Sequence, residues 1–267
     1  MQGKQVKTSN GNIVYWISDE FDEGRETLFF LHGLTGDHTM FQPQFPFFEK
    51  KYNIIAWDAP AHGESRPYRN FSFENAVKGM KQIVDECGCS KVTLIGQSMG
   101  GFNAQAFLCR YPDFVKAFVA IDSTPYGDYY SRSDIWWLHQ IEWMSKLFTE
   151  KMLKMSMARQ NAVTKMGQEN MAAMIDRYGK AELCHLMGIG FAGFLEDNRE
   201  LQISCPVLLI VGEKDRTGKV KSYNKKWAKR TGFPLVWIQN AAHNSNVDNP
   251  HMVNSSIMTF LQDFMKR

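Results

Sequence analysis

Residues 91–101 read KVTLIGQSMGG, and this stretch decides the fold. Its apolar first half predicts a short strand over Lys91 to Ile95, and the residues that follow predict a helix from about Met99 to Arg110. Between them lies the pattern G-x-S-x-G centred on Ser98, in the strand–turn–helix context that this motif requires. The turn is so tight that side chains two residues either side of the serine would collide, which explains Gly96 and Gly100. Ser98 is therefore expected to project from the carboxyl end of a strand in a strained conformation.

The rest of the chain alternates predicted strands and helices. Short apolar runs bounded by Gly, Asp or Pro predict strands, and a longer periodic pattern predicts a helix over Phe73 to Glu86. The further predicted strands cover residues 12–17, 27–31, 53–57, 116–121, 207–211 and 235–238. A last helix follows Asn249 and Pro250, a pair that suits a helix start. This rhythm predicts a single α/β domain over residues 1–267, with a mostly parallel, twisted sheet flanked by helices on both faces.

One segment, roughly Tyr126 to Glu200, breaks this rhythm. It contains no strand-like run, and it holds eight of the fifteen methionines together with Trp136, Trp137 and Trp143. A structureless insertion of that length is uncommon in a compact domain, so we expect a helical cap inserted between the strands that end near 121 and begin near 206. Methionine-rich helices pack against varied apolar partners. Most of these side chains are expected to seal the cap onto the core, and about a third to line a pocket.

A serine hydroxyl needs a neighbouring base to become a nucleophile, and a histidine held by a carboxylate is the usual base. His243 is the one of the seven histidines that lies in a strand-end loop and leaves room for an acid between itself and Ser98. Asp215 follows the preceding strand and is the favoured acid, because the expected chain order is nucleophile, acid, histidine. Two other carboxylates remain candidates for the acid. They are Asp122, which closes an earlier strand, and Glu213, in the same turn as Asp215.

Attack of such a serine on a carbonyl produces an oxyanion, which backbone N–H groups usually stabilise. One donor of this oxyanion hole is expected to be the amide of Met99, directly after the serine. The other is expected to be the amide of Leu34, in the loop after the strand over 27–31. Gly33 and Gly36 let this loop turn towards the serine. His32, at its start, is interpreted as a structural residue that holds the loop.

Four motifs, in this order, resemble those of the α/β-hydrolase superfamily, in particular its small capped serine hydrolases, which include carboxylesterases, lactonases and C–C hydrolases. They are His32-Gly33, the loop from Asp58 to Ser65, Gly96 to Gly100, and Asp215 with His243. Together they span nearly the whole chain outside the expected cap. The second resembles the D-x-P-G-x-G-x-S loop of the superfamily, with Ala61 where glycine is usual. The resemblance implies the α/β-hydrolase fold, and it implies that Asp58 and Ser65 order a loop beside the site.

Composition narrows the expected cofactors and partners. The net charge of +3 is too small to indicate a nucleic-acid or membrane partner. Five scattered cysteines argue against a disulfide framework, and no secretory leader is expected, so a reduced, cytoplasmic protein is predicted. No clustered Cys and His set predicts a metal. The glycine pattern over Gly188 to Gly193 follows no predicted strand, so no nucleotide cofactor is expected.

The sequence therefore predicts a serine hydrolase that cleaves a carboxylic ester, lactone or thioester of a small, partly apolar molecule through an acyl-enzyme on Ser98. One alternative is C–C hydrolysis or elimination on the same scaffold, in which Arg132, Arg159 or Arg177 would anchor a substrate carboxylate. Solvated surface positions are the simpler interpretation of these arginines. The other alternative is a ligand-binding protein with little turnover, since a fold does not fix a function.

Overall fold

The computed structural model describes residues 1–22 and 24–265. Eight strands form one sheet in the order β1-β2-β4-β3-β5-β6-β7-β8. β1 pairs antiparallel with β2, β2 pairs antiparallel with β4, and the strands from β3 to β8 are all parallel to one another. The strand bounds are Gln2–Thr8 (β1), Gly11–Ile17 (β2), Thr27–Leu31 (β3), Asn53–Trp57 (β4), Val92–Gln97 (β5), Val115–Ile121 (β6), Val207–Gly212 (β7) and Leu235–Ile238 (β8). The predicted, mostly parallel sheet is confirmed.

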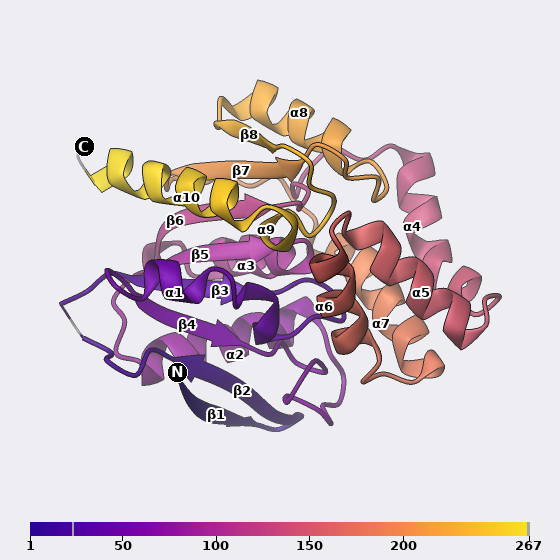
Figure 1. The fold of residues 1–267 in the computed structure, drawn as a ribbon, viewed down its shortest axis with the longest axis horizontal. Helices are drawn as coiled ribbons and strands as arrows, with labels where there is room; N and C mark the ends of the chain where they lie inside the picture. The colour runs from indigo at the N-terminus through magenta and orange to yellow at the C-terminus, as the bar shows by residue number, and fades with distance from the viewer. Residues whose placement is uncertain (23, 266–267) are drawn as a thin grey trace.

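Helices cover both faces of this sheet. In Figure 1, α1 and α10 lie in front of the strands, whereas α2 and α3 lie behind them. The helices outside the segment between β6 and β7 are η1 (His38–Phe41), α1 (Phe45–Phe48), α2 (Phe73–Glu86), α3 (Met99–Arg110), η2 (Pro112–Phe114), α8 (Val220–Thr231), α9 (Ser245–Asp248) and α10 (Pro250–Met265). Every residue of β3, β4, β5 and β7 is buried, as expected for strands that helices cover on both sides.

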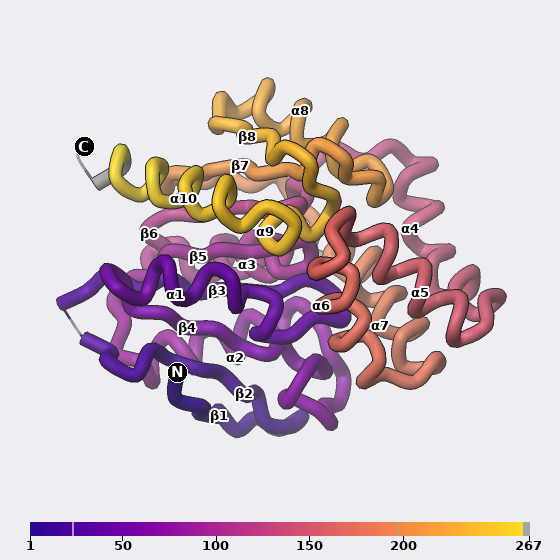
Figure 2. The backbone as a smooth tube through the Cα atoms, viewed as in Figure 1, coloured from indigo at the N-terminus to yellow at the C-terminus, as the bar shows by residue number. Residues whose placement is uncertain are grey.

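The segment between β6 and β7 folds into helices. It contains α4 (Arg132–Ser145), α5 (Glu150–Asn161), α6 (Lys165–Ile175), α7 (Lys180–Ala192) and η3 (Gly193–Asp197), which we call the inserted helices. The side chains of Ser131, Thr149 and Thr164 accept hydrogen bonds from backbone amides in the first turns of α4, α5 and α6, so each start is capped. Figure 1 shows the inserted helices grouped beyond the arrowheads of the strands. Figure 2 shows both chain termini on the other side of the molecule.

The register of the parallel strands brings their carboxyl ends to one edge of the sheet. Leu31 pairs with Gly96, Gln97 pairs with Ile121, and Gly212 pairs with Ile238. The loops that follow β3, β5, β6, β7 and β8 therefore emerge side by side at the carboxyl edge of the sheet. Ser98, Leu34, Asp215 and His243 lie in these loops, and Met99 opens the helix that follows β5. Arg132, Arg159 and Arg177 lie in the segment between β6 and β7, and none of them lines the cavity that contains Ser98.

Candidate active site

The turn around Ser98 joins β5 to α3 and strains the backbone of the serine. Ser98 has φ 49° and ψ −115°, in the positive-φ region that residues with a side chain rarely adopt. A Cβ on Gly100 would lie 1.9 Å from the carbonyl oxygen of Leu31, and one on Gly96 would lie 2.5 Å from the carbonyl oxygen of Gly100. Backbone packing therefore requires glycine at both positions, and it holds the half-buried Ser98 at the N-terminus of α3.

Three side chains from three of the loops form a hydrogen-bonded chain. Nε2 of His243 lies 2.9 Å from the hydroxyl oxygen of Ser98, and Nδ1 of the same ring lies 2.9 Å from Oδ2 of Asp215. An ionised carboxylate only accepts hydrogen bonds, so Nδ1–H donates to Asp215, and the bare Nε2 of the neutral ring accepts the serine proton. The structure thus brings together the three side chains that the sequence placed in a triad.

Within this hydrogen-bonded triad, Asp215 and His243 each stabilise the charged form of the other. Burial acts to lower the pKa of His243, but the charge and hydrogen bond of Asp215, with the charge of Asp122, outweigh it and raise that pKa. Burial acts to raise the pKa of Asp215, but the charge and hydrogen bond of His243, with the amide of Thr217 donating at 2.7 Å, lower it. Asp215 is therefore held ionised, and His243 is a stronger base than a free histidine.

The two carboxylates that stayed open as alternative acids occupy other positions. Glu213 is exposed to solvent. Asp122 is buried, and its carboxylate accepts hydrogen bonds from the amide of Gly212 at 2.7 Å and from the amide of Ser245 at 3.0 Å. Gly212 ends the strand that precedes Asp215, and Ser245 follows the histidine loop. Asp122 therefore ties the two loops together, while burial and the charge of Asp215 raise its own pKa.

The two residues expected to supply the oxyanion donors, Leu34 and Met99, lie beside Ser98. Met99 is the first residue of α3, so its N–H is one of those that no carbonyl of the helix accepts. The loop after β3 approaches the same turn so closely that a Cβ on Gly33 would lie 2.1 Å from Oε1 of Gln97. Leu34, the next residue, lines the same cavity as Ser98 and Met99. Both expected donors are therefore beside the serine.

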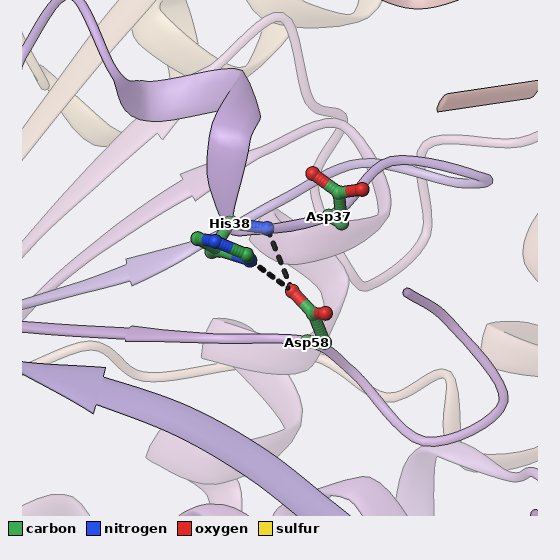
Figure 3. Close-up of side chains that lie close together, drawn as sticks. All are labelled: Asp37, His38 and Asp58. Carbon is green, nitrogen blue, oxygen red and sulfur yellow. Dashed lines mark hydrogen bonds and ion pairs between the residues drawn. The ribbon is translucent and has the colours of Figure 1, made fainter. Parts of the chain in front are cut away.

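Asp37, His38 and Asp58 form the one group of acidic and histidine side chains with metal-ligand spacing within residues 1–22 and 24–265. Figure 3 shows His38 contacting Asp58 twice, through its backbone amide at 2.7 Å and through Nδ1 at 2.9 Å. The other carboxylate oxygen of Asp58 accepts from the amide of Glu64 at 2.6 Å, and Asp37 accepts from Arg177 at 3.2 Å. N–H donors already occupy these carboxylate oxygens. The group therefore connects loops and gives no reason to propose a metal site.

Two further side chains order the same loops. Ser65 donates to the carbonyl oxygen of Asp58 at 2.6 Å and accepts from the amide of Val14 at 2.8 Å. Nε2 of His32 accepts from the amide of Ala59 at 2.9 Å, and burial lowers the pKa of His32. A neutral imidazole with an occupied acceptor nitrogen suits a structural role. These contacts agree with the roles that the sequence suggested for His32, Asp58 and Ser65.

Two side chains that no sequence pattern marks hold the histidine loop in place. Nε2 of Gln97, which lies within the serine turn, donates to the carbonyl oxygen of His243 at 2.8 Å. Asp248 in α9 accepts from the amide of Ala242 at 2.9 Å through Oδ2 and from the amide of Thr164 at 2.9 Å through Oδ1. Thr164 caps α6, which lies next to α9 in Figure 2, so Asp248 connects the histidine loop to the inserted helices. No local pattern marks either contact, because each joins residues far apart in the chain.

A cavity of about 600 Å³ lies over this site, between the sheet edge and the inserted helices. Ser98 and His243 form part of its wall. Its apolar lining is Leu34, Met99, Phe102, Tyr130, Trp137, Leu138, Ile141, Met144, Phe191, Phe194, Val220 and Tyr223. Two larger cavities, of about 790 and 960 Å³, are lined by α5 with α6 and by β7 and β8 with α10, and they contain none of the three triad side chains.

The three tryptophans of the inserted helices were expected to pack against the core or to line a pocket, and only one of them does so. Trp137 lines the cavity over Ser98. Trp136 and Trp143, in contrast, are 55% and 51% exposed, so neither seals the inserted helices onto the core. The glycines from Gly188 to Gly193 lie in α7 and at its C-cap, which is not the strand-to-helix turn of a nucleotide site.

Comparison with known proteins agrees with this fold. The family model described as alpha/beta hydrolase fold matches residues 26–250. An uncharacterized hydrolase of Bacillus subtilis, YugF, is 24% identical over 266 residues, which is 96% of each chain. The 3-oxoadipate enol-lactonase 2 of Acinetobacter baylyi is 22% identical over 253 residues, 90% of each chain. The solved structure of a thermophilic esterase from Thermogutta terrifontis has a TM-score of 0.78 at 20% identity and covers 99% of both chains. This last likeness is one of fold.

Proposed function

The chain belongs to the α/β-hydrolase fold family, and from that premise we propose that it is a serine hydrolase acting on a carboxylic ester, lactone or thioester of a small, partly apolar molecule. The observation that carries the proposal is the hydrogen-bonded chain from Ser98 through His243 to Asp215, with 2.9 Å at each contact. A fold by itself hosts many functions, so the proposal rests on the chemistry of this site.

In the first half of the proposed reaction, Nε2 of His243 takes the hydroxyl proton while Oγ of Ser98 attacks the substrate carbonyl. Asp215 keeps the ring in the required tautomer and stabilises the imidazolium. The amides of Leu34 and Met99 are the proposed donors to the negative oxygen of the tetrahedral intermediate. When that intermediate collapses, the imidazolium gives its proton to the leaving group, and the acyl group stays on Ser98.

The second half repeats these steps with water. His243 takes a proton from a water molecule, which attacks the acyl carbon, and the same proton returns to Oγ of Ser98 as the acid is released. The cavity suits this substrate class. Its volume of about 600 Å³ is within the ordinary range for small-molecule sites. Its surface is mostly apolar, and its polar lining includes Ser133, Asp134, Gln160, Arg216 and Lys219 as well as the groups beside the serine.

Replacing the serine tests the proposal. Ser98→Ala is expected to lower kcat/KM for a series of p-nitrophenyl esters by about 10⁴-fold or more, because no other group of the site supplies the attacking oxygen. Ser222→Ala, on the exposed face of α8, is the matched control and is expected to retain full activity. Unchanged turnover by the Ser98 variant would refute the mechanism. Consumption of a 2-hydroxy-6-oxo acid without a trapped acyl-enzyme would instead support C–C hydrolysis.

A further inference from the structure

Few charged side chains line the cavity over Ser98, and their pairing shows which of them can bind a substrate. Besides the triad histidine, the charged side chains among the described residues of its wall are Asp122, Asp134, Arg216 and Lys219. Arg216 and Lys219 lie in the loop between β7 and α8, directly after the triad acid. Because most of the remaining wall is apolar, a charge in it strongly affects which molecules bind there.

The ammonium group of Lys219 already has an acidic partner. Its Nζ lies 2.5 Å from Oδ1 of Asp134, near the start of α4. The other carboxylate oxygen of Asp134 accepts from the hydroxyl of Ser131 at 2.7 Å and from the amide of Ser131 at 3.0 Å. Burial acts to raise the pKa of Asp134, but the hydrogen bonds of Lys219 and Ser131 outweigh it and lower that pKa. Asp134 is therefore ionised, and it forms an ion pair with Lys219.

The carboxylate of Asp122 is also occupied. It is buried, and each of its two oxygens accepts a hydrogen bond from a backbone amide, one from Gly212 and one from Ser245. Both acids in the wall of the cavity therefore have their donors within the protein. A positively charged substrate group would have to compete with those donors, so the wall does not favour a cationic substrate.

Arg216 is different, because no described acid uses its donors. Among the described residues, no carboxylate forms an ion pair with its guanidinium. Its neighbour in the chain, Asp215, accepts from His243 and from the amide of Thr217. Arg216 is exposed and also lines the cavity, which places it at the rim. A guanidinium stays charged, and its planar set of N–H donors matches the two oxygens of a carboxylate.

We propose that Arg216 binds a carboxylate group of the substrate. Resting on the proposed function, this assigns the substrate to esters, lactones or thioesters that also carry a carboxylate. The scissile carbonyl would lie at Ser98, the apolar part of the substrate against side chains such as Phe102 and Phe194, and the carboxylate at the rim. One guanidinium balances the single charge of a carboxylate, whereas a phosphate carries more charge than one cation neutralises.

Two matched pairs of esters test this assignment. Mono-p-nitrophenyl adipate and the corresponding monoamide differ by one charge in the acyl part, and p-butyryloxybenzoate and p-butyryloxybenzamide differ by one charge in the alcohol part. In at least one pair, the unaltered chain is expected to cleave the acid with a kcat/KM about tenfold higher than that of the amide, because the charge-assisted contact is partly exposed to water. Added salt should reduce this preference.

Replacing Arg216 should remove the preference. Arg216→Gln is expected to bring the ratio of kcat/KM for acid and amide to about one, and Arg216→Lys to retain part of it, because the charge stays but the planar fork is lost. The ratio is the informative quantity, since a general disturbance of the site lowers both rates. Lys214→Gln removes an exposed cation of the same loop that does not line the cavity, and this matched control should keep the ratio.

A binding measurement separates this assignment from the proposed reaction. By calorimetry, Ser98→Ala is expected to bind one of the two acids about tenfold more tightly than the double variant S98A/R216Q does. That difference, found while the unaltered chain cleaves no ester, would support the carboxylate site and refute the reaction. The assignment to Arg216 is overturned if the unaltered chain cleaves acid and amide equally in both pairs, or if Arg216→Gln keeps the preference. It is also overturned if Lys219→Gln alone abolishes that preference.

Discussion

At the scale of single residues, the proposed chemistry depends on the two nitrogens of His243 having different partners. One nitrogen meets a carboxylate that keeps its proton, and the other meets the hydroxyl of Ser98. The motif around Ser98 and the chain order of Asp215 and His243 made this triad predictable, because both depend on short local patterns. The supporting contacts of Gln97, Asp122 and Asp248 were not predictable, because each depends on how distant loops meet.

Asp215→Asn is expected to have two effects. It removes the charge that raises the pKa of His243, and it favours the wrong tautomer of the ring, so kcat/KM should fall by about 10⁴-fold. The residual activity should extend to lower pH, because the acid limb of the profile follows the lowered pKa of the base. The pH dependence of kcat/KM measures both. Glu213→Gln, in the same turn but exposed, should leave the profile as it is. An acid limb at the original pH in the Asp215 variant would contradict the assignment of the carboxylate.

Gly100→Ala is expected to destabilise the fold. The added methyl group would lie 1.9 Å from the carbonyl oxygen of Leu31, so β3 and α3 must separate. A loss of about 3 kcal/mol or more in the free energy of unfolding follows from such overpacking. Denaturant titration measures it. At Gly179 nothing lies within 4 Å of an added Cβ, so Gly179→Ala should cost under about 1 kcal/mol. Equal stability of the two variants would show that the turn relaxes more easily than the structure implies.

At the scale of elements, the bounds of a strand or helix were predictable where the pattern of apolar residues reflects which side chains are buried. β3, β4, β8, α2 and α3 have the bounds that their apolar runs and helical periodicity predict. β1 was missed, because only Val6 of its seven residues is buried and no alternation of apolar residues appears. It is an edge strand that pairs with β2 alone, so its formation depends on that neighbour. The absence of strand-like runs predicted that the segment between β6 and β7 forms helices, as the structure shows, but the exposure of Trp136 and Trp143 was not predictable.

The contact between α9 and the start of α6 gives the prediction at this scale. Asp248→Asn leaves one acceptor oxygen where the carboxylate has two, so the amide of Ala242 or that of Thr164 loses its partner. The histidine loop is then less firmly placed, and kcat is expected to fall by about tenfold to a hundredfold with little change in KM. Steady-state kinetics on a short ester measures kcat and KM separately. Asp263→Asn on α10 is the control. A normal kcat would show that Asp248 does not position His243.

At the scale of the whole molecule, the sheet and the inserted helices differ in how much they bury. α4 buries only Ser145, and α5 buries only Leu153 and Ala158, whereas all of β5 is buried. Backbone amides in α4 and α5 are therefore expected to exchange with deuterium orders of magnitude faster than those of β5 and β6. Hydrogen exchange followed by mass spectrometry measures this. Equal protection of both parts would show that they open as one cooperative unit.

The measurement that tests the central claim most directly is the mass of the intact protein after incubation with a fluorophosphonate, followed by peptide mapping. A nucleophilic Ser98 activated by His243 should acquire one covalent phosphonyl group on that serine. The adduct should be absent from Ser98→Ala and should form far more slowly in His243→Ala. A folded protein that gains no adduct, or that carries the adduct on another residue, would contradict the assignment of Ser98 as the nucleophile.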